Sequence, residues 1–175
     1  MILPTLRTER LLLRPFRRDD IPELVPLIGA REVAATTRSI PHPYTAADAE
    51  KFISASQEAA EINLAIVRQG DLQLIGGGIL RPDTNDKHAE VGYWIGVPYW
   101  GNGFATEAAR ALVQYAFETL QMHRVYAFHT SNNPASGQVL GKIGMKNEGK
   151  MRQHQRKWGE YQDVEFYGLL REEWP

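Results

Sequence analysis

The sequence predicts a domain of the α+β (α/β mixed) class built on a mixed β-sheet. Apolar residues recur at helical spacing in some segments and form short strand-like runs in others, so helices and strands are interspersed along the chain. Residues 89–130 read as strand, helix and strand, which predicts a right-handed crossover between two parallel strands. The predicted order is one strand, two helices, three strands, a helix, a strand, a helix and two final strands.

The first predicted elements are a strand at 9–16 and two helices. Asp20 is a suitable N-cap for the first helix, and Glu23 stands in the capping-box position three residues later. Pro26 does not suit a helix interior, so this helix should be short or kinked. The second helix is predicted to begin at 45–48, where a threonine and an aspartate stand three residues apart.

Three consecutive strands are predicted at 62–68, 72–80 and 89–97. A Gln-Gly-Asp turn joins the first two and predicts a hairpin. Residues 104–120 then change period, with alanine, leucine and valine recurring at three- and four-residue spacing. This spacing predicts the longest helix of the chain.

The last predicted elements are a strand at 125–129, a short helix and two strands within 145–170. Asn133 is a suitable N-cap for the short helix, and the proline after it suits the first helical position. Gly144 is placed to end that helix. The loop between the two final strands contains Lys157, Trp158 and Gly159.

Composition fits a soluble globular protein. The chain has 175 residues, of which 43% are hydrophobic and 23% are charged, and its net charge is −1. This balance does not favour nucleic acid or an anionic membrane as the main partner. The absence of cysteine excludes disulfides, thiolate metal sites and cysteine nucleophiles, and no metal is expected. Neither a signal peptide nor a membrane-spanning run is predicted, so a cytoplasmic location is expected.

The stretch PYWGNGFATEA (98–108) joins a predicted strand to the longest predicted helix. The amides of a first helical turn lack internal partners and favour an anion, and glycines let a phosphate approach them. Gly101 and Gly103 are equally consistent with a tight turn alone. Phe104 and Ala105 stand where the Walker pattern needs Lys and Ser or Thr, and the third glycine of the dinucleotide fingerprint is missing.

Two motifs in this chain resemble those of the GNAT superfamily of N-acetyltransferases. The run from Trp100 to Ala105 resembles the acetyl-CoA pyrophosphate loop, with Trp100 departing at the first position. The run Asn133-Pro-Ala-Ser136, with Leu140-Gly-Lys-Ile-Gly-Met, resembles the second signature helix. TERLLLRPFRRDD and DVEFYGLLREEW are similar to the branch containing ribosomal-protein N-terminal alanine acetyltransferases. The resemblance implies one GNAT-like domain over residues 1–175, with a central mixed and splayed sheet and helices on both faces.

The resemblance also implies a site for acetyl-CoA as co-substrate. The backbone of the strand before the loop would hold the thioester carbonyl and pantetheine, the loop would hold the pyrophosphate, and the second signature helix would contact pantetheine and phosphate. The implied cofactor-binding residues are Ile95, Val97, Trp100, Gly101, Asn102, Gly103, Phe104, Ala105, Thr106, Asn133 and Lys142.

The family reaction is direct attack of an amine on the thioester, which needs a base, an oxyanion donor and protection of the leaving thiolate. Glu90 is the first choice as base and His88 the second, although Glu90 is equally consistent with an exposed strand residue. Leu140 stands where many family members have a tyrosine that acts as general acid toward the thiolate. Ser136 inherits the role of proton donor, or is only a small polar residue near a helix start.

The sequence says less about the acceptor amine than about the acetyl donor. The branch resemblance implies a protein N-terminal α-amine, while a small-molecule amine such as an antibiotic or polyamine remains an alternative. A third reading is a non-catalytic acyl-CoA-binding regulatory module. The segment 41–44 and Trp158 are expected near the acceptor. No nucleic acid or membrane partner is expected, and the chain is expected to be a monomer or a homodimer.

Overall fold

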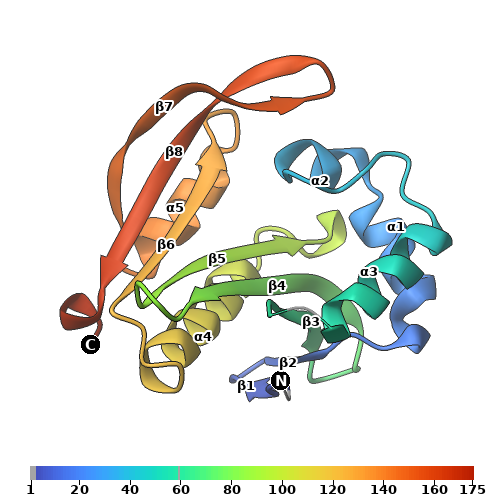
Figure 1. Cartoon of the computed structure of the whole chain (residues 1–175). Coiled ribbons are helices and arrows are strands. Elements are labelled where there is room, and N and C mark those ends of the chain that lie inside the picture. The colour runs from blue at the N-terminus through green and yellow to red at the C-terminus, as the bar shows by residue number, and fades with distance from the viewer. Residues whose placement is uncertain (1–2, 59) are drawn as a thin grey trace.

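The structure, a computed structural model that describes residues 3–58 and 60–175, contains one mixed sheet (Figure 1). Within these ranges the strand order is β1-β2-β3-β4-β5-β6-β8-β7, and neighbours are antiparallel except for the parallel pair β5 and β6. The strands are β1 (Leu6–Arg7), β2 (Leu11–Pro15), β3 (Ile62–Arg68), β4 (Leu74–Asp83), β5 (His88–Ile95), β6 (Arg124–Thr130), β7 (Lys146–Lys157) and β8 (Glu160–Leu170).

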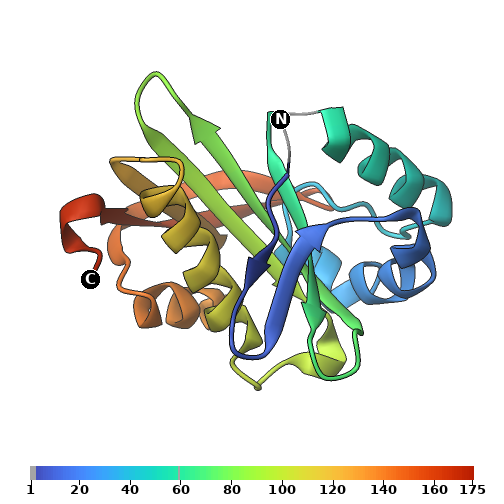
Figure 2. The ribbon, with the colours of Figure 1, turned by 90° about the horizontal axis from the view of Figure 1, so that it is seen from below.

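Helices cover both faces of the sheet (Figure 2). One face carries α1 (Ile21–Ile28), α2 (Arg31–Thr36) and α3 (Ala46–Glu58), and the other carries α4 (Phe104–Glu118) and α5 (Pro134–Lys142). Within the described ranges, no helix combines the length and apolar character that crossing a bilayer requires. The predicted mixed sheet with helices on both faces is confirmed.

Alternation along the strands divides the interior into two hydrophobic clusters. In β3, Ile62, Leu64 and Ile66 pack toward α4 and α5, whereas Ala65 and Val67 pack toward α1 and α3. All five are buried, because a central strand between two helical layers has no solvent-facing side. The burial of both faces fixes the register of the sheet, since a slip of one residue would exchange the two sets.

The parallel pair β5 and β6 separates soon after it forms. Its register joins His88 to Arg124, Ala89 to Val125 and Glu90 to Tyr126, and the described pairing stops there. Both strands continue with their other neighbours, β5 with β4 up to residue 95 and β6 with β8 up to residue 130. The two halves of the sheet therefore diverge and leave a gap between β5 and β6 (Figure 1). The predicted splay is confirmed.

Most predicted elements are present, but the structure adds two elements and ends one predicted strand early. A short strand β1 precedes β2, and α2 lies between the two helices that the sequence predicts. Only Val33 and Ala34 of α2 are buried, which is too little for a visible helical period. The strand predicted at 89–97 ends at Ile95, and Val97 begins a short 3₁₀ helix, Val97–Tyr99. Pro98 suits that turn because it has no backbone N–H to give to a sheet.

The two predicted capping boxes have different outcomes. At α3, the Thr45 amide donates to Asp48 and the Asp48 amide donates to the Thr45 hydroxyl, at 2.9 and 3.2 Å, as predicted. At α1 the prediction is wrong. The Asp20 side chain instead accepts hydrogen bonds from Arg14, at 2.7 and 2.8 Å, and Glu23 accepts one from the amide of Leu74 at 2.9 Å. Asp20 also accepts a hydrogen bond from the amide of Arg17 at 2.7 Å, so its partners precede it in the chain and do not include the first amides of α1.

Candidate active site

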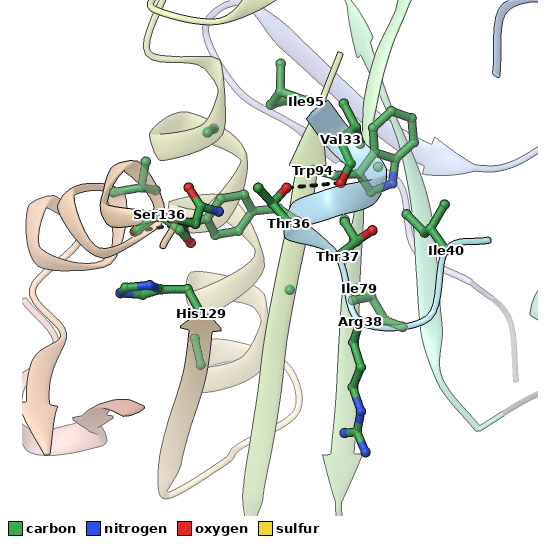
Figure 3. Close-up of a pocket in the computed structure, with 18 of the residues that line it drawn as sticks. Val33, Thr36, Thr37, Arg38, Ile40, Ile79, Trp94, Ile95, His129 and Ser136 are labelled. Carbon is green, nitrogen blue, oxygen red and sulfur yellow. Dashed lines mark hydrogen bonds between the residues drawn. The ribbon is translucent and has the colours of Figure 1, made fainter. Parts of the chain in front are cut away.

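A cavity of ≈ 690 Å³ occupies the gap between β5 and β6. It begins at the start of α4, passes between Val91 and Ala127 on the two separating strands, and continues toward the connection between α2 and α3. Figure 3 shows Ser136 and His129 on one side of this space and Thr36, Thr37 and Ile40 on the other. The cavity therefore connects the two helical layers through the sheet.

The glycine turn before α4 needs both of its glycines. Gly101 and Gly103 have φ of +77° and +78°, a region in which residues with a Cβ are strained. A Cβ added at Gly101 would meet no atom within 4 Å, so close packing is not what excludes a side chain there. Gly103 is the N-cap of α4, and the first amides of the helix follow it. The turn thus meets a conformational need and also leaves room for a ligand near the helix N-terminus.

Arg10 and Glu107 brace this turn from outside the cavity. Arg10 donates to the Glu107 carboxylate at 2.7 Å and to the carbonyl of Asn102 at 3.0 Å, and its guanidinium lies 4.7 Å from the centre of the Phe104 ring. The Thr8 hydroxyl donates to Glu107 at 2.6 Å. Burial opposes ionisation of Glu107, but the hydrogen bonds from Thr8 and Arg10 outweigh it and hold the pKa of this carboxyl below its ordinary value.

Side chains within the loop tie it to the end of β5. The Trp100 indole N–H donates to the carbonyl of Ile95 at 2.6 Å. The Asn102 amide donates to the carbonyls of Tyr99 and Trp100 at 3.2 and 2.9 Å. Asn102 therefore shapes the loop and its side chain does not line the cavity, and neither does Val97. The other residues predicted to bind the donor do line it, namely Ile95, Trp100, Gly101, Gly103, Phe104, Ala105, Thr106, Asn133 and Lys142.

The backbone of β5 presents hydrogen-bond donors to the gap. The Gly96 amide donates to the carbonyl of Ile75 at 2.8 Å, on the side of β4. Successive amides of a strand point to opposite edges, so the amide of Ile95 is directed toward the gap. Val97 lies beyond the strand in the 3₁₀ helix and does not share this alternation. Of the two predicted backbone donors, Ile95 has the geometry that the prediction requires and Val97 does not.

Glu90 lines the cavity at the level where β5 and β6 still pair. Its carboxylate accepts a hydrogen bond from Arg81 at 2.6 Å, and Arg81 also pairs with Glu61 at 2.9 Å. Only 18% of the Glu90 side chain is exposed, so it is not the exposed strand residue of the alternative reading. His88, the second choice as base, packs against the Tyr126 ring with centres 5.5 Å apart and does not line the cavity.

Ser136 lies in the first turn of α5 and lines the cavity. Its hydroxyl is 3.1 Å from the phenol oxygen of Tyr93, which comes from β5 on the other side of the gap. Burial raises the pKa of Tyr93 to about 12. The position where many family members have a tyrosine is Leu140, which is buried and carries no hydroxyl. Sequence reasoning placed Tyr93 in a strand but gave no sign of its contact with Ser136.

His129 is a second residue that the sequence did not single out. It lies at the end of β6, is buried, and lines the cavity. Its Nδ1 is 2.8 Å from the carbonyl of Thr130, and its Nε2 has no partner among the described residues. The ring packs on that of Tyr167 with centres 5.5 Å apart. A histidine within a buried strand gives no local signal that separates a site residue from a core residue.

The expected acceptor side lies where the tip of the β7–β8 hairpin meets the segment 36–44. Lys157 is buried, and its ammonium donates to the carbonyl of Ile40 at 2.7 Å. Burial lowers the pKa of Lys157. The Trp158 ring lies beside that of His42, with centres 5.8 Å apart. Pro41 and Tyr44 line the cavity as expected, whereas Trp158 does not and instead holds the hairpin against this segment.

The chain is similar to known acetyltransferases over most of its length. Residues 10–146 match the family model described as an acetyltransferase (GNAT) domain. The chain is 31% identical over 169 residues to the uncharacterized N-acetyltransferase YnaD of Bacillus subtilis, covering 95% of this chain and 97% of that protein.

Two further likenesses concern named substrates. The chain is 30% identical over 84 residues to the [ribosomal protein uS5]-alanine N-acetyltransferase of Escherichia coli, covering 48% of this chain and 43% of that protein. The solved structure of spermidine N-acetyltransferase from Vibrio cholerae, in complex with CoA and spermine, has the same fold, with a TM-score of 0.82 and 23% identity over 95% of this chain and 98% of that one.

Replacing Glu107 tests the brace behind the glycine turn. Glu107→Gln should lower the free energy of unfolding by about 1.5–3 kcal/mol at pH 7, since hydrogen bonds to charged groups have this magnitude. A depressed carboxyl pKa stabilises the folded state above the unfolded pKa of about 4.3 and loses that contribution as pH falls through the folded pKa. Urea unfolding at pH 7 and pH 3 should therefore show a difference that shrinks at pH 3.

Asp71→Asn is the matched control, because Asp71 pairs with Arg68 in a solvent-exposed contact. Its effect should be smaller than that of Glu107→Gln at pH 7. A Glu107→Gln difference that stays constant between the two pH values contradicts the assignment of a depressed pKa to Glu107.

Proposed function

The chain belongs to the GNAT family of acetyltransferases and is an N-acetyltransferase, and on that premise we propose that it transfers the acetyl group of acetyl-CoA to a primary amine by direct attack. The observation that carries the proposal is one cavity that joins the N-terminus of α4 to the gap between β5 and β6. An anionic head and an extended arm of one donor molecule fit these two parts in turn. The non-catalytic reading is not retained, since the family is one of enzymes.

The donor site in this proposal follows the shape of the cavity. The pyrophosphate would accept hydrogen bonds from the first amides of α4, where the helix dipole favours negative charge. The open space above Gly101 supports this assignment. The pantetheine arm would lie in the gap, where Asn133 lines the wall and the Ile95 amide, directed away from β4, is left for the thioester carbonyl. Lys142 at the end of α5 would pair with a CoA phosphate.

In the proposed chemistry Glu90 takes a proton from the attacking amine and Ser136 gives one to the leaving thiolate. The amine nitrogen attacks the thioester carbonyl, and the Ile95 amide stabilises the oxyanion that forms. The nitrogen then loses a proton to Glu90, directly or through water, and the C–S bond breaks as the carbonyl re-forms. Ser136 gives a proton to the departing thiolate. Arg81 holds one oxygen of Glu90, which leaves its second oxygen for the proton.

We propose a protein N-terminal α-amine as the acceptor. The similarity to a ribosomal-protein alanine acetyltransferase supports this choice. Asn63 and Gln155 are buried and line the cavity. Their side-chain amides can each donate a hydrogen bond to a peptide carbonyl and accept one from a peptide N–H. A polycation such as spermine is less well matched, because the charged residues that line the same region are of both signs and do not form an acidic surface, namely Arg38, Asp48, Lys51, Arg81 and Glu90.

A charge placed on the first turn of α4 tests the donor site. Ala105→Asp should weaken acetyl-CoA binding by about 100-fold or more, because the carboxylate would face the pyrophosphate at short range. Ala105→Asn introduces a side chain of nearly the same size as aspartate but without the charge, so this variant should bind acetyl-CoA much more tightly than Ala105→Asp. Isothermal titration with acetyl-CoA measures both, and equal affinities for the two variants would contradict the loop assignment.

Loss of the proposed base should slow the reaction and leave the donor site intact. Glu90→Gln should lower kcat by about 10²- to 10⁴-fold, the usual contribution of a general base, with acetyl-CoA affinity unchanged. Glu61→Gln alters the other partner of Arg81 without touching Glu90 and is the matched control. The measurement is CoA thiol release with a saturating amine, and full activity in Glu90→Gln would remove Glu90 from the mechanism.

A panel of amines tests the acceptor. An alanine-initiated peptide amide should react with a higher kcat/KM than spermidine or a simple alkylamine. Asn63→Leu should reduce kcat/KM about tenfold for the peptide, since one neutral hydrogen bond is lost, and should leave the alkylamine unchanged. A higher kcat/KM with spermidine than with the peptide would contradict the peptide acceptor and indicate a polyamine instead. An equal effect of Asn63→Leu on both substrates would contradict recognition of a peptide group.

A further inference from the structure

We propose that Tyr93 is a positioning residue for Ser136 and that it returns to the serine hydroxyl the proton that this hydroxyl gives to the CoA thiolate. The inference rests on the proposed function above, in which Ser136 faces the leaving group. It adds a residue from β5, a strand on the other side of the gap from α5. The arrangement supplies a phenol where Leu140 provides none.

The contact between Tyr93 and Ser136 spans the gap. The phenol oxygen of Tyr93 is 3.1 Å from the Ser136 hydroxyl oxygen and 3.3 Å from the Ser136 carbonyl oxygen. Both side chains line the cavity, so a thioester that enters the gap must pass beside this pair. Figure 3 shows Ser136 directed into this space from α5.

The first turn of α5 is also fixed from the side of β6. A Cβ added at Gly137 would lie 2.7 Å from Nε2 of His129 and 3.0 Å from the hydroxyl of Tyr167, so only glycine allows this approach. Gly137 therefore packs closely against His129 and Tyr167, while the preceding residue, Ser136, meets Tyr93 across the gap.

The chemistry explains why a second hydroxyl is needed. A serine hydroxyl that protonates a thiolate is left as an alkoxide, a much stronger base than the group it has neutralised. A neighbouring phenol removes this obstacle by giving its own proton to the serine oxygen as the serine proton leaves. A tyrosine phenol is neutral at physiological pH, and although burial raises the pKa of Tyr93 to about 12, the phenol is still a much stronger acid than an alcohol and can give its proton to the serine oxygen.

The step balances with no additional reactant. The C–S bond breaks, its electron pair stays on sulfur, and sulfur takes the Ser136 proton to form the CoA thiol. Ser136 takes the Tyr93 proton, and the phenolate recovers a proton from solvent. The proton that the amine gave up through Glu90 is released to solvent, so the sum is one amide and one thiol from one amine and one thioester.

The test compares Tyr93→Phe with Ser136→Ala, their double variant and Tyr115→Phe. Tyr115 lies on α4, is partly buried and does not line the cavity, so it controls for loss of a phenol. The fastest amine of the panel above is used in single-turnover acetyl transfer. Tyr93→Phe should lower the transfer rate by about 10- to 100-fold with acetyl-CoA affinity unchanged, within the usual range for proton-transfer groups. The double variant should be no slower than the slower single variant, because the two residues act as one unit.

A proton inventory in mixtures of H₂O and D₂O separates proton transfer from bracing. The unaltered chain should give a curved dependence, since two protons move together, and Tyr93→Phe should give a straight line. A Tyr93→Phe variant that equals Tyr115→Phe, or that lowers only acetyl-CoA affinity, overturns the inference while the proposed function stands. Absence of acetyl transfer by the unaltered chain overturns the proposed function and this inference together.

Discussion

The early end of the pairing between β5 and β6 is the constraint on which the rest of the structure depends. An uninterrupted parallel pair would use the amides of β5 in the sheet and would leave no passage between the helical layers. Pairing stops after Glu90 and Tyr126, while β4 and β8 continue to hold the two strands apart. The Ile95 amide is then directed into the cavity. Glu90 lies at the closed end of the gap, and Ser136 lies along its wall.

The sequence predicts those parts of the site that are built from neighbours in the chain. The glycine turn before α4 combines an abrupt change of period with two glycines that have positive φ in the structure. The strand Ile62–Arg68 has the predicted bounds, because its apolar run is bordered by polar residues. These signals are local, and so they survive without knowledge of the fold.

Contacts between distant residues are what the sequence does not predict. Glu107 is an acid in a first helical turn, and nothing nearby shows that Arg10 and Thr8 hold it. Tyr93 occupies an ordinary strand position until α5 brings Ser136 to it. The residues proposed for the donor are therefore easier to predict from the sequence than those proposed for the acceptor, which come from β3, β7 and the segment 36–44 with no common motif.

The contact between Lys157 and the carbonyl of Ile40 joins the two halves of the molecule at a place far from the short pairing of β5 with β6. The sheet alone would be a wedge, hinged at the short pairing of β5 with β6 and free at its wide end. With the hairpin tip resting on the segment before α3, the polypeptide forms a closed frame around the passage. In the proposed function the amine of the acceptor would enter this frame, which suits a flexible chain end better than the side of a folded domain.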